Sequence, residues 1–286
     1  MDKINSNGAV GAPLVSTTWL AERLGRPGVA VVDASWYLPA MQRDGRAEYS
    51  SAHIPGAVFF DIDAISDQST DLPHMLPSEA DFAAAMGALG ISDEMEIVVY
   101  DGAGLFSAPR VWWMLTSFGA GNVHVLDGGR PAWLAEGHPT ESGATRPTPT
   151  TFHARLQPSA VASFEEVRMA LEARSAQVAD ARPAARFRGE APEPRAGVVS
   201  GHMPGASNLP ASDLIADGRL KAPEVLMAEF AKAGIDPHAP LITSCGSGVS
   251  AAILNLALAT AGKPRPRLYD GSWTDWAARN APVAPA

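Results

Sequence analysis

The sequence has very little cysteine, no metal-binding pattern and no long hydrophobic run. Cys245 is the only cysteine among 286 residues. A single cysteine excludes an internal disulfide framework and the cysteine-rich zinc and iron–sulfur sites. The seven histidines form no HxxEH or HExxH pattern, so we expect neither a catalytic metal nor another cofactor. No apolar run reaches the ~20 residues needed to cross a bilayer.

Positive charge is also scarce. The chain has 22 Lys and Arg against 31 Asp and Glu, and its formal net charge is −9 at pH 7. This balance argues against a nucleic-acid or anionic-membrane partner. The first residues include Lys3 but no apolar core of signal-peptide length. We therefore expect a cytoplasmic protein in a reducing compartment, although the sequence leaves an organelle open.

The chain contains an internal repeat. The VVDA of residues 31–34 recurs as VADA at 178–181, the AHIPGA of 52–57 recurs as GHMPGA at 201–206, and the VLDGG of 125–129 recurs as RLYDG at 267–271. The three matches keep the same order and nearly the same spacing, which indicates duplication. We predict two related domains, residues 14–141 and 160–281. A Pro-, Thr- and Ser-rich linker, residues 142–159, joins them.

Short apolar runs alternate with helical patterns in both halves. The expected strands are residues 29–32, 97–100, 123–126, 177–179, 241–244 and 267–269, and the expected helices are 18–24, 80–89, 108–118, 164–173, 223–233 and 249–261. Ser78 and Ser163 have the spacing of helix N-caps, and Gly119 and Gly262 stand where helices should end. The alternation predicts an α/β fold with two mostly parallel sheets, each with helices on both faces.

The segment around Cys245 carries the strongest chemical signal. A β-prone run at 241–244 leads into Cys-Gly-Ser-Gly-Val-Ser, after which the pattern becomes helical. This order places the thiol at the carboxyl edge of a sheet, where α/β proteins bind ligands. Gly246 and Gly248 let several N–H groups face one centre, and a helix N-terminus favours a thiolate. A lone cysteine is often a small buried hydrophobe, but an inert core position has no need for two neighbouring glycines.

The first half has a corresponding loop without a cysteine. It reads Val-Val-Tyr-Asp-Gly-Ala-Gly, with Asp101 at the position of Cys245. A carboxylate is a poor substitute for a thiolate nucleophile. We therefore expect the second domain to carry the chemistry and the first to support it.

These motifs together resemble the tandem rhodanese-type sulfurtransferases. The paired His-x-Pro-Gly-Ala motifs, the single cysteine loop and the YDGSW of 269–273 carry the resemblance, with Asp275 where glutamate is more usual. The closest subgroup is the 3-mercaptopyruvate sulfurtransferases, which the following stretches resemble: DASWYLP at 33–39, FFDID at 59–63, HMLP at 74–77, SAPRVWW at 107–113 and RFRG at 186–189. The CGSGV of 245–249 is the discriminating stretch, because thiosulfate-preferring rhodaneses typically have cationic side chains in this loop.

The resemblance implies a set of site residues. Cys245 corresponds to the nucleophile, Ser247, His74 and Asp63 to a proposed proton-transferring arrangement, and Arg186 and Arg195 to the substrate-binding arginines. Arg188 lies between these two arginines and is easily mistaken for either. The remaining expected contacts to substrate come from the loop residues Gly246, Gly248, Val249 and Ser250. His53 and His202 we interpret as structural, since both halves have one.

The implied reaction transfers sulfur through a persulfide on Cys245. It takes the sulfur of 3-mercaptopyruvate, releases pyruvate, and passes the sulfur to thioredoxin, a small thiol or cyanide. Two alternatives stay open: a thiosulfate:cyanide sulfurtransferase, and a sulfur-relay module without fast turnover. A Cys-x5-Arg phosphatase is nearly excluded, because the position that needs the phosphate-binding arginine is Ala251.

Overall fold

Two five-stranded parallel sheets organise the chain in the computed structural model, which describes residues 11–284. The first sheet has the strand order β1-β5-β4-β2-β3, and the second has the order β6-β12-β11-β7-β8. These are the same order within each half, and every pairing in both sheets is parallel. The predicted α/β fold and the internal duplication are therefore confirmed. Residues 1–10 and 285–286 lie outside the described residues.

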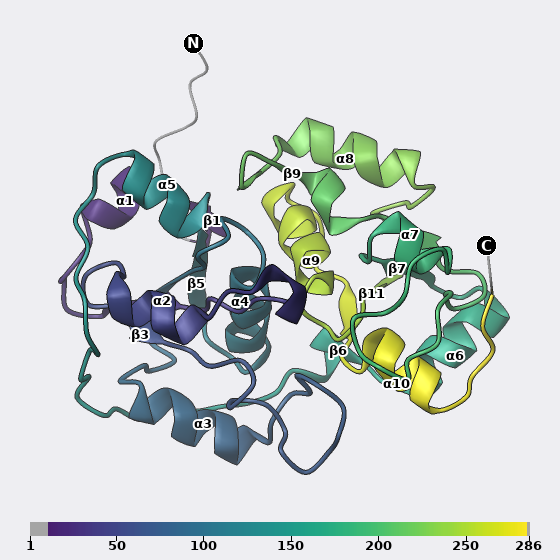
Figure 1. The fold of residues 1–286 in the computed structure, drawn as a ribbon, viewed down its shortest axis with the longest axis horizontal. Coiled ribbons are helices and arrows are strands. Elements are labelled where there is room, and N and C mark those ends of the chain that lie inside the picture. The colour runs from purple at the N-terminus through teal and green to yellow at the C-terminus, as the bar shows by residue number, and fades with distance from the viewer. Residues whose placement is uncertain (1–10, 285–286) are drawn as a thin grey trace.

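Strands and helices alternate along the chain in both halves, and the second half has the β9–β10 hairpin in addition (Figure 1). The first half contains β1 (Leu14–Val15), α1 (Thr17–Ala21), β2 (Val29–Asp33), η1 (Pro39–Met41), α2 (Gly45–Ser51), β3 (Val58–Phe59), α3 (Glu79–Ala88), β4 (Glu96–Tyr100), α4 (Ala108–Ser117), β5 (Asn122–Leu126) and α5 (Gly129–Ala135). The second half contains η2 (Pro158–Ala160), β6 (Val161–Ala162), α6 (Phe164–Ala173), β7 (Gln177–Asp180), α7 (Ala184–Phe187), β8 (Ser207–Asn208), η3 (Ala211–Leu214), β9 (Ile215–Ala216), β10 (Arg219–Leu220), α8 (Pro223–Lys232), β11 (Leu241–Ser244), α9 (Ala251–Thr260), β12 (Arg267–Tyr269) and α10 (Ser272–Ala278).

Most of the long elements lie where the sequence predicts them. The expected N-caps form, because the hydroxyl oxygens of Ser78 and Ser163 accept from Asp81 N and Glu166 N. Helix α9 begins at Ala251 and not at residue 249, since Val249 and Ser250 belong to the cysteine loop. The sequence did not reveal the two-residue strands β1, β3, β6, β8, β9 and β10, nor the helices α2, α5, α7 and α10. Elements this short contain too few residues for a hydrophobic period to show.

Each sheet is covered on both faces because its strands alternate in side-chain direction. In the first sheet, Val31 and Val98 pack in one cluster with residues of α1, α2 and α5. The neighbouring Val32 and Val99 pack on the opposite face with α3 and α4. The second sheet repeats this arrangement, with α6 and α10 on one face and α8 and α9 on the other.

The two halves share a hydrophobic core at the centre of the molecule. Helices α4 and α9 pack against each other across the boundary between the halves (Figure 1). Both helices are almost fully buried, including Trp113 of α4 and Leu254 of α9. A shared apolar interface of this kind holds two domains in one arrangement. Side chains of the first half are thereby held next to the cysteine loop of the second.

A small antiparallel hairpin from the second half also reaches the first half. Strands β9 and β10 form it. The Arg219 guanidinium donates to Asp127 O at 3.0 Å, and Leu220 N donates to the Asp127 carboxylate at 3.2 Å. These contacts anchor the hairpin on the first domain, so its position does not depend on its own short strands.

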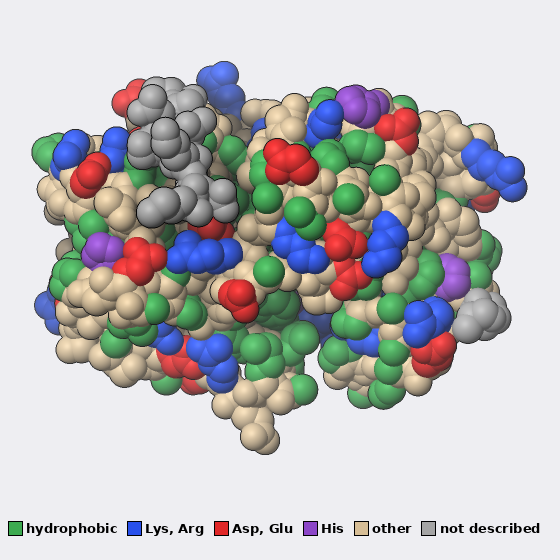
Figure 2. All heavy atoms as spheres, turned by 90° about the horizontal axis from the view of Figure 1, so that it is seen from above, with side chains coloured by type: hydrophobic (Ala, Val, Ile, Leu, Met, Phe, Trp, Pro, Cys, Tyr) green, Lys and Arg blue, Asp and Glu red, His purple; other side chains and the backbone are tan. Residues whose placement is uncertain are grey.

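The surface carries charges of both signs. On the face shown in Figure 2, acidic and basic side chains are interspersed and no large basic patch is visible. Among residues 11–284, every helix is too short or too polar to span a bilayer.

Glu48 on α2 is the centre of an ionic cluster in the first domain. It accepts hydrogen bonds from Arg43 Nη2 at 2.6 Å, Arg130 Nη2 at 2.6 Å and the Tyr37 hydroxyl at 2.8 Å. The hydrogen bond from Arg43 is the main cause that lowers the pKa of Glu48 from 4.5 to about 2, and burial opposes the shift. A carboxylate with a depressed pKa stabilises the fold above its ordinary pKa and loses this effect as the pH falls through its folded pKa.

We therefore expect Glu48→Gln to destabilise the protein by about 1–3 kcal/mol at pH 7. The difference from the unsubstituted protein should shrink as the pH falls below ~4.5 and should vanish only below pH ~2, where the Glu48 carboxyl is neutral in the folded protein as well. Denaturant unfolding at several pH values measures this directly. A difference that stays constant down to pH ~2 would contradict the assignment.

Candidate active site

Cys245 lies at the carboxyl end of the central strand of the second sheet. Strand β11 pairs with β7 on one side and β12 on the other, and Cys245 follows it directly. Its side chain is 2% exposed. The loop from Cys245 to Ser250 then leads into the N-terminus of α9. The strand and the helix therefore hold the thiol at the edge of the sheet that the sequence predicts.

Ser272 holds the cysteine loop in shape. Its hydroxyl oxygen accepts hydrogen bonds from Cys245 N and Gly248 N, both at 3.1 Å, and its hydroxyl donates to Tyr269 O at 2.8 Å. Ser272 is fully buried and has a φ of 50°, which a side-chain-bearing residue adopts rarely. The sequence shows Ser272 only as part of a motif. Its supporting role depends on the return of β12 to the same sheet edge.

The loop needs glycine at position 248. Gly248 has a φ of 80°, and a Cβ there would lie 2.8 Å from an Arg110 nitrogen and 3.0 Å from Asp270 O. The Gly248 N–H donates to the Ser272 hydroxyl oxygen, so it is not among the loop amides that lack an acceptor. Within residues 11–284, the N–H groups of Gly246, Ser247, Val249, Ser250 and Ala251 have no hydrogen-bond acceptor. These amides can receive an anion.

The corresponding loop of the first domain shows what such an anion does. One carboxylate oxygen of Asp101 accepts from Phe106 N, Ser107 N and Ala108 N at 2.7–2.9 Å. The other accepts from Ala103 N at 2.9 Å. The first domain thus fills its own amide loop with a built-in carboxylate. The second domain has a thiol at this position and leaves the amides for a charge that forms on or near sulfur.

Three residues of the predicted proton-transferring arrangement lie in contact. Nδ1 of His74 is 3.0 Å from the Ser247 hydroxyl oxygen, and Nε2 of His74 is 3.0 Å from an Asp63 carboxylate oxygen. The Trp36 indole N–H donates to the other Asp63 oxygen at 3.0 Å. The hydrogen bond from His74 is the largest cause that lowers the pKa of Asp63 below its usual value, against the effect of burial. The first domain therefore places an ionised carboxylate and an imidazole next to the cysteine loop.

The backbone around His74 is held by an ion pair that joins the two domains. His74 has a φ of 61° and is 3% exposed. Arg110 of α4 donates to His74 O at 2.5 Å and forms an ion pair with Asp270 at 2.7 Å. The other Asp270 oxygen accepts from Leu76 N at 2.7 Å. Sequence reasoning assigned no role to Arg110 or Asp270. Both lie inside stretches that carry the family resemblance, residues 107–113 and 269–273, and this is the signal that could have singled them out.

The two predicted substrate-binding arginines line one cavity with Cys245. Arg186, on α7, forms an ion pair with Glu193, and its buried Nε–H has no partner within the described residues. Arg195 has no hydrogen bond or ion pair with any described side chain. Burial lowers the pKa of Arg195, while the nearby Cys245 and Asp63 act in the opposite direction. Arg188 instead pairs with Glu190 on the surface and does not line this cavity.

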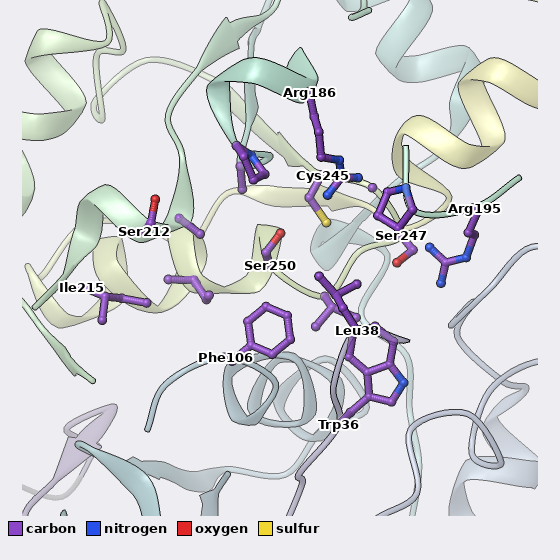
Figure 3. Close-up of a pocket in the computed structure, with 17 residues that line it drawn as sticks. Trp36, Leu38, Phe106, Arg186, Arg195, Ser212, Ile215, Cys245, Ser247 and Ser250 are labelled. Carbon is purple, nitrogen blue, oxygen red and sulfur yellow. The ribbon is translucent and has the colours of Figure 1, made fainter. Parts of the chain in front are cut away.

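The cavity encloses about 250 Å³ at the boundary between the domains. Figure 3 shows the Cys245 sulfur near its middle, with Arg186 and Arg195 on one side and Phe106, Ser212 and Ile215 on the other. Of the predicted loop contacts, Gly246, Val249 and Ser250 line the cavity, as does Ser247, whereas Gly248 does not.

His53 and His202 lie in structural positions. The His53 ring stacks on Tyr49, and its Nδ1 lies 2.7 Å from Tyr49 O. The His202 ring stacks on Phe187 in the same way, with Nδ1 3.0 Å from Phe187 O. Within residues 11–284, no group of three His, Cys, Asp or Glu side chains is arranged to hold a metal ion.

The fold and the site define a two-domain α/β protein with a single buried thiol at the carboxyl edge of its second sheet, in a loop whose backbone N–H groups are largely without acceptors among residues 11–284. The model of the rhodanese-like domain matches residues 16–136 and again residues 163–279. The chain belongs to the rhodanese-like family and contains two of its domains.

Relatives and a solved structure extend over nearly the whole chain. The chain is 45% identical to 3-mercaptopyruvate sulfurtransferase of Escherichia coli K12, over 95% of this chain and 97% of that protein. It is 47% identical to thiosulfate sulfurtransferase of Bos taurus, over 94% and 93% of the two chains. It is similar to the crystal structure of a 3-mercaptopyruvate sulfotransferase from Escherichia coli, with a TM-score of 0.85, 44% identity, and 92% and 99% of the two chains covered. Identity over the whole chain does not separate the two substrates.

Proposed function

We propose that this protein is a 3-mercaptopyruvate sulfurtransferase that carries sulfur as a persulfide on Cys245. The observation that carries this proposal is the distribution of positive charge in the cavity. The loop from Cys245 to Ser250 has no cationic side chain, and the charged residues that line the cavity within residues 11–284 are Arg186 and Arg195. This separation suits a donor whose carboxylate lies two carbons from the reacting sulfur better than it suits the compact thiosulfate dianion.

The first half-reaction forms the persulfide. The Cys245 thiolate attacks the sulfur of 3-mercaptopyruvate, a new S–S bond forms, and the C–S bond of the substrate breaks. The electron pair of that bond passes to the carbon skeleton as the enolate of pyruvate, which takes up one proton at carbon. We assign this proton delivery to Ser247 and His74, with Asp63 fixing the imidazole tautomer. The free amides of the loop stabilise negative charge on the outer sulfur.

The second half-reaction restores the thiol. An acceptor such as a small thiol, thioredoxin or cyanide attacks the outer sulfur, and the electron pair of the broken S–S bond returns to Cys245. This is a ping-pong scheme through a covalent intermediate. In this scheme the first domain, residues 14–141, supplies His74 and Asp63, and the second, residues 160–281, supplies Cys245. We further propose a cytoplasmic location, where reduced thiol acceptors are available.

The second candidate is a thiosulfate:cyanide sulfurtransferase, which the likeness to the bovine thiosulfate sulfurtransferase favours. The deciding experiment compares pyruvate release from 3-mercaptopyruvate plus a thiol with thiocyanate formation from thiosulfate plus cyanide. We expect kcat/KM for 3-mercaptopyruvate to exceed that for thiosulfate by at least about tenfold, because one well-placed charged contact is worth ~1.5–3 kcal/mol. A higher value for thiosulfate would assign the protein to the second candidate.

The arginine assignment makes a separate prediction. Arg195→Ala and Arg186→Ala should each raise KM for 3-mercaptopyruvate by about 10- to 100-fold, because each removes a charge-assisted hydrogen bond to the carboxylate. Initial rates over a range of donor concentrations measure this effect. Arg188→Ala is the matched control, since Arg188 lies in the same segment but is paired with Glu190 at the surface. An unchanged KM in the Arg186→Ala/Arg195→Ala double variant would refute the carboxylate contact.

A further inference from the structure

The active-site cavity extends beyond the part that a 3-mercaptopyruvate molecule needs. On the side away from the arginines it continues along η3 and the first residue of the β9–β10 hairpin (Figure 3). We call this part the apolar arm. Its lining residues are Phe106, Ala211, Ser212, Ile215, Val249 and Ile253, and none of them is charged.

Contacts within the protein hold the wall of the apolar arm in place. Ala211 and Ile253 are buried, at 8% and 1% exposure, and Ile215 begins the hairpin that Arg219 and Leu220 anchor to Asp127 of the first domain. Phe106 comes from the Asp101 loop, where its N–H is bonded to the Asp101 carboxylate. Contacts from both domains therefore hold this surface in place beside Cys245.

Binding of the donor 3-mercaptopyruvate does not require this apolar surface. The carboxylate of 3-mercaptopyruvate is drawn to Arg186 and Arg195, and no further part of this three-carbon molecule remains to fill an apolar space. The ping-pong scheme, however, requires a second molecule to reach the same sulfur after pyruvate has left. The free energy falls when an uncharged hydrocarbon body leaves water for an apolar surface. A charged group has to lose its hydration there, so its transfer is unfavourable.

We propose that the apolar arm binds the hydrocarbon body of a neutral thiol that accepts the sulfur. This inference rests on the proposed persulfide and adds the chemical class of its small-molecule acceptor. The acceptor thiolate attacks the outer sulfur of the Cys245 persulfide and forms a new S–S bond. The bond between Sγ and the outer sulfur breaks, and its electron pair stays on Sγ. The acceptor leaves as its own persulfide, so the step needs no external oxidant or reductant.

The test is a single-turnover discharge with a series of alkanethiols. Cys245 is loaded as a persulfide with inorganic polysulfide, and its discharge by ethanethiol, 1-propanethiol or 1-butanethiol is followed by mass spectrometry. The three thiols have nearly the same acidity, so differences in rate report binding of the chain. We expect the second-order rate constant to rise about fourfold for each added methylene. The anionic 3-mercaptopropionate should discharge more slowly than 1-propanethiol after correction for thiol acidity.

Two variants connect this series to the apolar arm. Ile215→Asn should flatten the dependence on chain length to less than about 1.5-fold per methylene, because a polar amide replaces the apolar wall. Val225→Asn is the matched control, since Val225 is exposed on α8 and does not line the cavity; it should keep the full dependence. A flat series in the unsubstituted protein, or an unchanged series in Ile215→Asn, would overturn the inference.

A parallel reaction keeps this inference separate from the proposed function. Incubation with one equivalent of 3-mercaptopyruvate per chain, without an acceptor thiol, should release one pyruvate per chain and leave one extra sulfur atom on Cys245. Absence of this pyruvate would contradict the proposed donor. The chain-length series still tests the apolar arm, because polysulfide loads the persulfide without that donor.

Discussion

Replacing Cys245 with serine should abolish pyruvate release from 3-mercaptopyruvate, with a loss of kcat on the order of 10⁴ or more. A serine hydroxyl is not ionised at neutral pH, and its oxygen cannot carry the transferred sulfur as a persulfide. The fold should be preserved, because the backbone N–H of Cys245, and not its thiol, is bonded to Ser272. Turnover is measured as pyruvate formed in the presence of a thiol, and the persulfide as the mass of one added sulfur atom.

The control for this experiment is a substitution at Ser247 of the same loop. Ser247→Ala keeps the thiol and should still form the persulfide, while its kcat falls because the contact with His74 is lost. Residual turnover above about one per cent in Cys245→Ser would show that another nucleophile performs the reaction. Since the chain has no second cysteine, such a nucleophile would have to be of another residue type.

Replacing Arg110 with methionine should lower the free energy of unfolding by about 3–5 kcal/mol. The Arg110 side chain is fully buried, and its partner Asp270 is 5% exposed on the side chain. The substitution leaves the Asp270 carboxylate buried at the domain boundary without its counter-ion, and it removes the donor that holds His74 O. Denaturant unfolding measures the first effect, and kcat measures the displacement of His74 from Ser247.

Two further variants separate these effects. Arg110→Met/Asp270→Asn should recover much of the lost stability, because no unpaired buried charge remains. It should not recover kcat, because His74 O still lacks its donor. In a His74→Ala background, Arg110→Met should reduce kcat no further if it acts through His74. Arg168→Met is the matched surface control; its pairs with Glu165 and Glu172 are exposed, so a change below about 1 kcal/mol is expected. If the losses of kcat caused by Arg110→Met and by His74→Ala simply add in the double variant, Arg110 acts on the fold and not through His74.

The comparison of the two amide loops explains why one domain is reactive and the other is not. Both loops follow the central strand of a parallel sheet and precede a helix of the shared core. Asp101 satisfies its loop with a fixed carboxylate. Cys245 leaves its loop amides free, so the same architecture becomes a place where charge can develop during a reaction.

The amino-acid sequence by itself determined the α/β class, the duplication, the position of Cys245 between a strand and a helix, and the neutral composition of its loop. These features are local, because a short apolar run, a glycine pair or a missing cation can be recognised from neighbouring residues alone. The resemblance to a family added Arg186, Arg195, His74 and Asp63 as candidates. Without it, these are ordinary polar residues in loops.

Only the tertiary structure decided which of these residues meet. His74 reaches Ser247 from the other domain because α4 and α9 pack in one core and Arg110 pairs with Asp270 across the boundary. Ser272 supports the cysteine loop because β12 returns beside β11. Contacts between residues so distant along the chain depend on how whole layers pack, and no local pattern in a single sequence records them.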